Sequence, residues 1–305
     1  MIALGSAPAL AQTIERKTGL TAGGHAVSNY GSISWSLGQP ASATYEGGGI
    51  ITAGVQQPDE VVLALNMRAL LDGPYREFAG LMHDGLRSSG LIPLAEPFTA
   101  LGYTHVGGGS EQLAPTALSN IGNDALVDWV LIELREADGI TQVATRSAVV
   151  QRDGDVVGMD GTSSVRLPAV PGSYRVAIHH RNHLPVITAT SIALLQGINS
   201  LDFTDGSVLT YGNEAQRIRG GVRLLWAGDV SGDGVVKYVG EDNDRDPILQ
   251  AIGGTVPTNT TTGYVPEDVN LDGVVKYVGE DNDRDPILQS IGGSVPTNTR
   301  TQQIP

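Results

Sequence analysis

Short runs of alternating apolar and polar residues recur along the first three quarters of the chain. Two of them, residues 33–37 and 49–55, lie near the N-terminus, close to glycine clusters at 23–24 and 47–49 that predict turns. A period of two places every second side chain on one face, which is the pattern of a half-buried strand. Residues 12–58 contain few large side chains, so we expect this Gly/Ser-rich β segment to pack against something else.

Residues 59–225 show the same pattern with larger apolar side chains. Strand-like runs occupy residues 61–67, 127–135 and 148–157, and Asp153-Gly154 breaks the last of them in the manner of a hairpin. Because short strands recur with a turn about every ten residues, the pattern predicts a mainly β fold, an Ig-like or carboxypeptidase-regulatory-like β-sandwich. Shorter strands are expected at 164–167, 174–178, 187–195 and 201–211.

Helical patterns are short and few. Residues 78–86 fit one short helix. Nearer the C-terminus, Asp246 precedes Pro247, and Gly253 follows the last apolar residue of a second run. An acid, then a proline at the first helical position, then a glycine after the end are the start and stop signals of a helix. We therefore predict a helix that begins at Pro247.

This second helix belongs to a unit that occurs twice. Between residues 229 and 262, 29 of 34 residues are identical to those 39 positions later. Near-identity at a fixed spacing marks a repeated supersecondary unit, in which each copy needs its neighbour to bury its apolar residues. We therefore place the pair in a C-terminal region, residues 226–305, and expect its helices to pack together. Their apolar faces would consist of Ile248, Leu249 and Ile252 in one copy and Ile287, Leu288 and Ile291 in the other.

Each copy opens with the spacing D-x-[SN]-x-D-G, the first half of a calcium loop. In such a loop, positions 1, 3 and 5 supply side-chain oxygens, the glycine allows a sharp turn, and position 7 supplies its carbonyl. The alternative, an Asp-Gly turn followed by a solvated acidic run, explains two near-identical copies poorly. The sequence therefore predicts two Ca²⁺ sites. Their candidate ligands are Asp229, Ser231, Asp233 and Val235 in the first copy, and Asp268, Asn270, Asp272 and Val274 in the second.

The spacing alone does not identify the residue that closes each loop. An EF-hand loop ends in an acid at position 12, but that position is Gly240 in the first copy and Gly279 in the second. The closing ligand must therefore come from the Glu-Asp-Asn-Asp run that follows. We favour its last acid, because a residue at the N-terminus of a helix is held by a fixed backbone. These acids are Asp244 and Asp283, and the preceding asparagines, Asn243 and Asn282, are the second choices.

The C-terminal pair resembles the dockerin-type calcium repeats of bacterial secreted proteins. The resemblance covers residues 227–300 and is carried by the paired D-x-[ND]-x-D-G spacing. It implies calcium binding and a docking role toward a scaffold protein. The longer loop, which ends in Asn-Asp-Arg-Asp-Pro, differs from the dockerins that bind cohesins.

The rest of the chain is similar to large secreted bacterial proteins described as haemagglutinin-like. In those proteins a Gly/Ser-rich segment ending in Gly-Val-Gln-Gln-Pro, here residues 54–58, precedes β-domains. The resemblance implies a secreted, adhesin-like β-protein, and it assigns no chemistry to the shared stretches. These stretches are residues 127–130 with 133–135, residues 152–155 and residues 180–183.

Charge and composition narrow the possible partners. The chain has 33 acidic and 19 basic residues, a formal charge of −14, which argues against a nucleic-acid partner because phosphates require a basic face. Residues 229–305 contain 13 acids and 5 bases, so more than half of the excess lies in the repeats. Such a surface is either highly soluble or neutralised by bound cations.

The N-terminus indicates export. Residues 2–11 resemble the end of a signal peptide, with Ala9-Leu10-Ala11 as the cleavage site, so we expect residues 1–11 to be a signal remnant. No run approaches the ~20 apolar residues of a membrane span. The chain has no cysteine, which excludes disulfides and thiolate catalysis. We expect a protein that is secreted or held at the cell surface.

No catalytic motif is present. The chain lacks G-x-S-x-G, a phosphate-binding P-loop and H-E-x-x-H. His179, His180 and His183 place three imidazoles within five residues, which a transition metal could use if His179 and His183 shared a strand face. We favour the alternative, the polar end of a strand before Pro185. We therefore expect no enzymatic activity.

Together these patterns favour a secreted or cell-surface calcium-binding structural or adhesion protein. In this hypothesis the β-domain binds a protein or glycan surface ligand, and calcium rigidifies the C-terminal pair. One alternative is a dockerin-type docking module in a polysaccharide-processing assembly. A second is a homo-oligomer, an extracellular fibre whose subunits join through the N-terminal strand segment. A polysaccharide-degrading enzyme is the least favoured.

Overall fold

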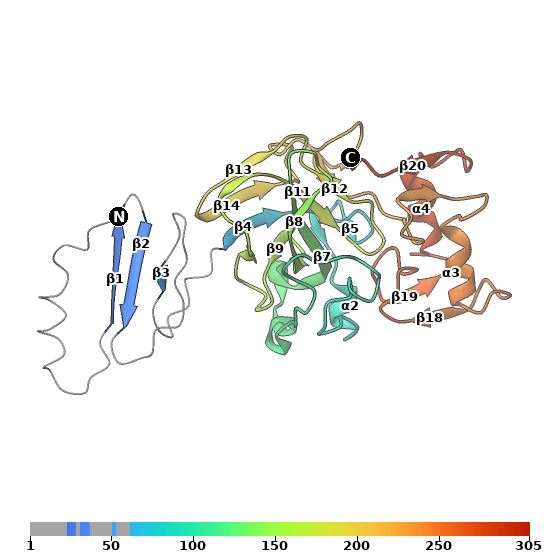
Figure 1. Cartoon of the computed structure of the whole chain (residues 1–305). Helices are drawn as coiled ribbons and strands as arrows, with labels where there is room; N and C mark the ends of the chain where they lie inside the picture. Colours follow the sequence, from blue (N-terminus) through green and yellow to red (C-terminus); the bar gives the residue numbers. More distant parts are fainter. Residues whose placement is uncertain (1–22, 29–30, 37–50, 53–61) are drawn as a thin grey trace, which may run out of the picture. The chain divides into compact units, whose positions relative to one another are not determined.

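The computed structural model describes residues 23–28, 31–36, 51–52 and 62–305. The chain divides into two units, residues 1–60 and 61–305. The first contains a three-stranded sheet with the order β1-β2-β3 (Figure 1). Strands β1 (Gly23–Ser28) and β2 (Gly31–Ser36) form an antiparallel hairpin, and β3 (Ile51–Thr52) pairs with β2 in parallel.

Both strands predicted in this unit are present where the structure describes them, as β2 and β3. The predicted turn at Gly23-Gly24 is wrong, because both glycines lie in β1, paired with Ser36 and Trp35. The expected turn at 47–49 and the signal remnant at 1–11 lie outside the described residues.

A mainly antiparallel sheet of nine strands dominates the second unit, so the predicted mainly β class is confirmed. The order along its main path is β10-β4-β9-β8-β7-β11-β12, with β13 added to β11 and β14 added to β4. The strands are β4 (Leu63–Arg68), β7 (Leu126–Arg135), β8 (Gln142–Gln151), β9 (Asp155–Val157), β10 (Val165–Leu167), β11 (Gly172–His179), β12 (Val186–Ile187), β13 (Ile192–Leu194) and β14 (Gly197–Asp202).

The pairing of β4 links two groups of strands. One edge of β4 pairs with β10 at its start and with β9 at Met67 and Arg68. Its other edge pairs in parallel with β14 along its whole length. β9 then continues into β8 as the predicted hairpin around Asp153-Gly154.

The long strand β7 is buried on both faces. Trp129 is inaccessible to solvent, and its indole nitrogen donates to the carbonyl of Pro93 (3.0 Å). Pro93 belongs to the irregular segment between β4 and β7, which also carries Leu86, Phe98 and Leu113 into the same core. Because this segment covers one face of β7, both sets of alternating apolar residues are buried (Figure 1).

The irregular segment has little regular structure. It contains β5 (Tyr75–Arg76), β6 (Leu81–Met82), the one-turn helix α2 (Gly85–Ser88) and two 3₁₀ turns, η1 (Pro115–Ser119) and η2 (Gly122–Asp124). The predicted helix at 78–86 is therefore wrong over most of its length. The expected strand at 201–211 ends at Asp202, and β15 (Arg217–Arg219) and β16 (Val222–Leu224) form a separate hairpin after it.

The two repeats are interlocked. Each consists of a loop, a short strand and a helix, followed by a second short strand. The strand after each helix pairs with the loop strand of the other copy: β18 pairs with β19, and β20 pairs with β17. The elements are β17 (Val235–Lys237), α3 (Arg245–Ala251), β18 (Thr260–Thr262), β19 (Val274–Lys276), α4 (Arg284–Ser290) and β20 (Thr299–Thr301).

A second apolar cluster holds the pair together. Ile248 and Ile252 of α3 and Ile287 and Ile291 of α4 are buried in one cluster with Val236 and Val275 of the loop strands. The expected packing of the two helical faces is confirmed. The predicted helix start is wrong by two residues, because α3 begins at Arg245 and its N-cap position is Asp244.

The repeats and the nine-stranded sheet belong to the same compact unit. Leu271 of the second loop is buried in the core of the sheet, and Leu184 from the sheet region is buried in the cluster of the repeats. The boundary between residues 225 and 226 stays a prediction. Among the described residues, no helix is long and apolar enough to cross a membrane.

Candidate metal centre

The first loop turns around its two acids. Asp229 accepts a hydrogen bond from the backbone N–H of Gly234 (3.1 Å), and Asp233 accepts one from that of Val235 (2.8 Å). The chain passes through left-handed conformations at Gly232 and Gly234, where φ is 71° and 81°. Glycine reaches this region without steric cost, so the D-G step allows the loop to fold back on Asp229.

Asp244 bridges the first loop through hydrogen bonds. Its carboxylate accepts from the backbone N–H of Ser231 (3.0 Å) and from that of Lys237 (2.7 Å). The carboxylate therefore faces back into the loop from the N-cap position of α3 and ties the start of the loop to its end. Asp244 is fully buried and Asp229 nearly so.

The second loop repeats this arrangement. Asp268 accepts from the backbone N–H of Asp272 (3.1 Å) and of Gly273 (2.9 Å). Asp283 accepts from Val269 (2.7 Å) and Asn270 (3.2 Å) through one oxygen, and from Lys276 (2.8 Å) through the other. Asp229 and Asp244 in the first loop, and Asp268 and Asp283 in the second, thus lie within range of each other's charge, and Asp244 and Asp283 are inaccessible to solvent.

The asparagines named as second choices cap the helices. Asn243 accepts from the backbone N–H of Asp246 (3.0 Å) and donates to the carbonyl of Gly240 (2.7 Å). Asn282 makes the corresponding bonds to Asp285 and Gly279. The oxygens of these asparagines are bonded to the helix backbone, whereas those of Asp244 and Asp283 are bonded to the backbone of the loops, so the choice between them stays a prediction.

Both loops hold carboxylates in an environment that disfavours their charge. Burial, followed by the charges of Asp244 and Asp233, raises the pKa of Asp229 to about 7, and burial raises the pKa of Asp244 to about 6. In the second loop, burial raises the pKa of Asp268 to about 6, and burial together with Asp268 raises that of Asp283 to about 8. Buried like charges repel unless a cation lies between them.

The donor chemistry fits a hard cation. The Oδ1 atom of Asp229 is buried and has no hydrogen-bond partner among the described residues. Across the described residues, no three His, Asp or Glu side chains form a group that could hold a metal ion. The candidate ligands of each loop are carboxylate, hydroxyl or amide, and backbone carbonyl oxygens, which is the mixture that Ca²⁺ accepts.

The two loops differ in their surroundings. In the first, Ser231 and Gly232 are exposed, whereas their counterparts Asn270 and Leu271 are buried. The carbonyl of Asn270 lies 2.9 Å from the Nε2 atom of His83. A β-carbon at Gly73 would lie 2.1 Å from the carbonyl oxygen of Val269, and one at Gly85 would lie 2.7 Å from the Cα atom of Asp272. The second loop is therefore docked against the sheet, and these two glycines permit the close approach.

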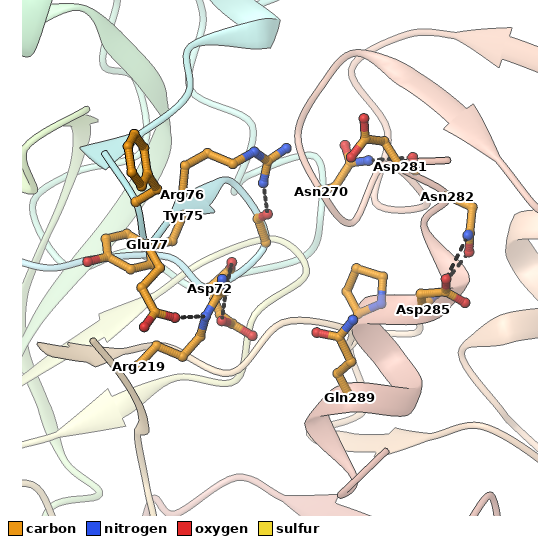
Figure 2. Close-up of a pocket in the computed structure, with 13 residues that line it drawn as sticks. Asp72, Tyr75, Arg76, Glu77, Arg219, Asn270, Asp281, Asn282, Asp285 and Gln289 are labelled. Atoms are coloured by element: carbon orange, nitrogen blue, oxygen red, sulfur yellow. Dashed lines mark hydrogen bonds and ion pairs between the residues drawn. The ribbon is translucent and has the colours of Figure 1, made fainter. Parts of the chain in front are cut away.

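A cleft runs along this docked side (Figure 2). Figure 2 shows Asp72, Arg76 and Arg219 on the side of the sheet and Asn270, Asp285 and Gln289 on the side of the repeat. Its polar groups are largely paired within each side: Arg219 donates to Asp72 (2.8 Å), and Asn282 donates to Asp285 (2.9 Å). We interpret the cleft as the boundary between the sheet and the repeat, each of which pairs most of its own polar groups.

Asn182 connects both loops to the sheet. Its carbonyl accepts from the backbone N–H groups of Gly228 (2.9 Å) and Asp229 (3.1 Å) at the start of the first loop. Its side-chain amide donates to the carbonyls of Pro266 and Asp268, both at 2.8 Å, at the start of the second. One buried residue thus positions the first candidate ligand of each copy.

A buried ionic cluster supports Asn182. Asp128 of β7 accepts from Arg181 Nε (2.9 Å), His180 Nε2 (3.1 Å) and the Tyr264 hydroxyl (2.7 Å), and its side chain is inaccessible to solvent. Although burial opposes ionisation, the Arg181 guanidinium and the His180 hydrogen bond hold the pKa of Asp128 well below its usual range. Arg181 also donates to the carbonyl of Val265 and stacks over the ring of Tyr264.

The three histidines do not form a common metal site. His179 Nε2 lies 3.2 Å from Glu133 Oε2, whereas His183 packs edge-on against His180. The backbone N–H of Gly73 donates to His183 Nε2 (3.1 Å), so the proton of that ring is on Nδ1, 3.0 Å from His180 Nδ1. Burial lowers the pKa of His183 well below its usual value, which keeps the ring neutral.

A pocket of about 400 Å³ lies beside the first loop. Asp229, Ser231, Tyr103, His179 and Arg181 are among the residues that line it. Burial and the charges of Asp229 and Glu133 raise the pKa of Tyr103 to about 12, so its hydroxyl remains a hydrogen-bond donor. The sequence does not predict this pocket, because it joins residues from five separate stretches of the chain.

The sequence patterns assign no role to the junction residues Asp128, Arg181, Asn182 and Tyr264. A signal was available for Asp128, a lone acid between Val127 and Trp129 in an apolar run, because a charge in a buried strand requires a partner. Comparison of the chain with family models, with curated proteins and with solved structures finds no match.

Proposed function

We propose that this chain is a secreted or cell-surface calcium-binding structural or adhesion protein, in which two Ca²⁺ ions hold the C-terminal repeats together. The observation that carries the proposal is the duplicated pairing of a loop acid with a closing acid. Asp229 with Asp244, and Asp268 with Asp283, are buried like charges. Within residues 62–305 none of the four forms an ion pair with a lysine or arginine.

Calcium would supply the missing positive charge. Asp229, Ser231, Asp233, the Val235 carbonyl and Asp244 would hold it in the first loop. The second set consists of Asp268, Asn270, Asp272, the Val274 carbonyl and Asp283. Because the helix of each copy packs with the loop strand of the other, an ion in one loop would stabilise both copies. Ion binding and folding of residues 226–305 would therefore be coupled.

We further propose that the nine-stranded sheet is an Ig-like β-sandwich that presents the adhesion surface. The split pairing of β4, with β10 and β9 on one edge and β14 on the other, supports two packed groups of strands. A binding role agrees with the paired, structural use of the buried acids and histidines, which leaves them no evident catalytic task.

A calcium titration of the full chain tests the proposal. Calorimetry should detect two bound ions, and the range must reach millimolar, because extracellular modules bind calcium with Kd values of about 10⁻⁴–10⁻³ M. The thermal midpoint should rise with calcium and fall when a chelator is added. Identical melts in calcium and in chelator, together with no heat of binding, would refute the proposal.

A further inference from the structure

The cleft between the sheet and the second repeat has walls of opposite charge. Figure 2 shows the Arg76 guanidinium on the sheet side directed toward the repeat, where Asn270 and Asp281 lie opposite. Asp285 adds a second carboxylate to the repeat side. Arg76, Asp281 and Asp285 are all exposed, and within residues 62–305 no ion pair joins the two walls. The cleft therefore presents a positive wall and a negative wall to solvent.

Arg76 is the group of the sheet side that has no acidic partner. Its one hydrogen bond within residues 62–305 runs from Nη1 to the carbonyl of Gly73 (3.3 Å). By contrast, Arg219 donates to Asp72 (2.8 Å) and lies 3.7 Å from Glu77. A guanidinium has five N–H donors in a planar fork that matches a carboxylate, so Arg76 is equipped to bind one.

The two copies of the repeat differ at the acid of the negative wall. In the first copy, Arg245 Nη2 donates to Asp246 Oδ1 at 2.9 Å. In the second, Arg284 Nε lies 4.0 Å from Asp285 Oδ1, outside hydrogen-bond range, and has no hydrogen-bond partner among the described residues. Asp285 Oδ1 is therefore open to a donor from a ligand. Asp246 does not line the cleft, so it is the matched comparison.

An aromatic ring stands at the edge of the cleft. Phe78 lines it from the turn between β5 and β6, and its relative exposure is 107%. No other large hydrophobic residue within residues 62–305 is as exposed. Because covering an apolar ring is favourable and aromatic residues are enriched at protein interfaces, Phe78 offers a contact for an apolar group of a ligand.

The opposite charges select a dipolar ligand. A purely anionic ligand would be repelled by Asp281 and Asp285, and a purely cationic one by Arg76. The cleft has a volume of about 400 Å³, which lies within the range of about 300–1,000 Å³ that is typical of ligand sites. Its three features come from β5, the β5–β6 turn and the start of α4. Separate side chains of a peptide match this spread better than the single α-carbon of a free amino acid.

We propose that this cleft binds a peptide segment of a partner protein, in which an acidic side chain pairs with Arg76, an apolar side chain packs on Phe78 and a basic side chain pairs with the acids of the repeat side. The inference goes beyond the proposed calcium sites. Arg76, Phe78, Asp281 and Asp285 are not among the candidate calcium ligands, and all four are accessible to a ligand.

A tripeptide screen on the full chain tests the inference. Acetylated and amidated tripeptides that contain aspartate, leucine and lysine in every order are titrated to millimolar concentration and monitored by ligand-observed NMR. We expect at least one of them to bind. Its neutral counterpart, with asparagine and glutamine in place of the charged residues, should bind at least tenfold more weakly, roughly the loss of one charge-assisted hydrogen bond. Free leucine should also bind more weakly.

Substitutions on each wall localise the binding. Arg76→Gln should weaken the best tripeptide roughly tenfold, and Asp285→Asn about fivefold, since each removes one charged partner. Phe78→Ala should weaken it about fivefold through loss of apolar contact. All three residues are exposed, so thermal midpoints should be unchanged. The matched controls, Asp246→Asn in the first copy and Ile140→Ala at an exposed turn outside the cleft, should bind as wild type.

The outcomes separate this inference from the proposed function. If no tripeptide binds, if the neutral tripeptide binds equally well, or if Asp246→Asn weakens binding as much as Asp285→Asn, the peptide inference is overturned. Equal binding of free leucine would overturn it as well, because one amino acid would then suffice. Calcium binding is measured separately by calorimetry. A chain that binds the tripeptide but no calcium would refute the proposed function and leave this inference standing.

Discussion

The side-chain amide of Asn182 donates to the carbonyl of Asp268 at 2.8 Å. The backbone carbonyl of the same asparagine accepts from the N–H of Asp229 at 3.1 Å. The first residues of two loops that are 39 positions apart in the sequence are thus held by a single buried side chain and its backbone. This junction fixes how the repeats sit on the sheet before any ion is considered.

Asn182→Ala should destabilise the compact unit. The substitution leaves the carbonyls of Pro266 and Asp268 without their donor, and each unsatisfied buried group costs about 1–3 kcal/mol. We expect the free energy of unfolding in urea to fall by roughly 2–4 kcal/mol. Asn213→Ala is the control, since Asn213 is exposed and its side chain makes no hydrogen bond within residues 62–305. Equal stability of the two variants would contradict the role of the junction.

Asp128→Asn should strongly destabilise the protein, although asparagine is similar in size to aspartate. The substitution removes the carboxylate charge that pairs with Arg181, so the guanidinium stays buried without its anionic partner. The loss of one partner of a buried ion pair costs about 3–5 kcal/mol. A double-mutant cycle with Arg181→Met separates pairing from packing. The double variant should lose less stability than the sum of the two single variants. Strict additivity in denaturant unfolding would show that the two charges do not interact.

The environment of Glu133 predicts that part of the free energy of unfolding is lost in acid. Although burial opposes ionisation, the hydrogen bond with His179 and the charges of His179 and Arg135 lower the pKa of Glu133 from 4.5 to about 2. Between these values the unfolded chain binds the proton more readily, so stability is present above pH 4.5 and is lost as the pH falls toward 2. The full effect is on the order of 3 kcal/mol.

Denaturant unfolding from pH 6 to pH 2, measured in chelator, checks this dependence. Glu133→Gln should flatten the fall in stability between pH 4.5 and 2, whereas Glu136→Gln, at an exposed turn position, should leave it unchanged. A Glu133→Gln profile that runs parallel to the wild-type profile would remove Glu133 as the source.

The closing acids offer a paired test of the calcium sites. Asp244→Asn and Asp283→Asn each remove one charge while retaining the side-chain shape, so each variant should bind one calcium ion instead of two in calorimetry. The thermal effect should differ between them. Asp283→Asn should lower the midpoint in calcium more, because only the second loop contacts His83 and places a side chain, Leu271, in the core of the sheet. Two ions bound by Asp244→Asn would assign the closing role to another residue.

Local patterns predicted the strands and the repeats well. The alternation in residues 127–135 and the Asp153-Gly154 turn depend on neighbouring residues only, and both appear as expected. The helix at 78–86 failed because Leu86 and its neighbours are buried by contact with β7 and not by a helical face of their own. Tertiary packing overrode a weak periodicity there.

The candidate ligands could be predicted from the sequence, but the contacts that join the two copies could not. A fixed spacing identified Asp229, Asp233 and their counterparts, and the position before a helix indicated Asp244. The exchange of strands between copies depends on β17 meeting β20, which are more than sixty residues apart, and no local pattern encodes it. The same holds for the contacts of Asp128 with Arg181 and Tyr264.

The single large difference between the loops supplies the last test. Leu271 and Gly232 occupy equivalent positions, and both have left-handed backbones, with φ of 63° and 71°. Leu271→Gly removes a fully buried side chain from the core of the sheet, which costs about 2–5 kcal/mol, although about 1 kcal/mol returns from relief of the backbone. Gly232→Leu adds an exposed side chain at a strained position and should cost only about 1 kcal/mol.

Urea unfolding in calcium measures the change in the free energy of unfolding for both variants. The docking of the second loop predicts that Leu271→Gly is the more destabilising variant by roughly 1–3 kcal/mol. Leu271→Gly should also reduce the difference between melts in calcium and in chelator, because a loop detached from the sheet transmits less of the binding energy of its ion. If Gly232→Leu proved equally destabilising, the docking of Leu271 in the core of the sheet would not distinguish the stability of the two loops.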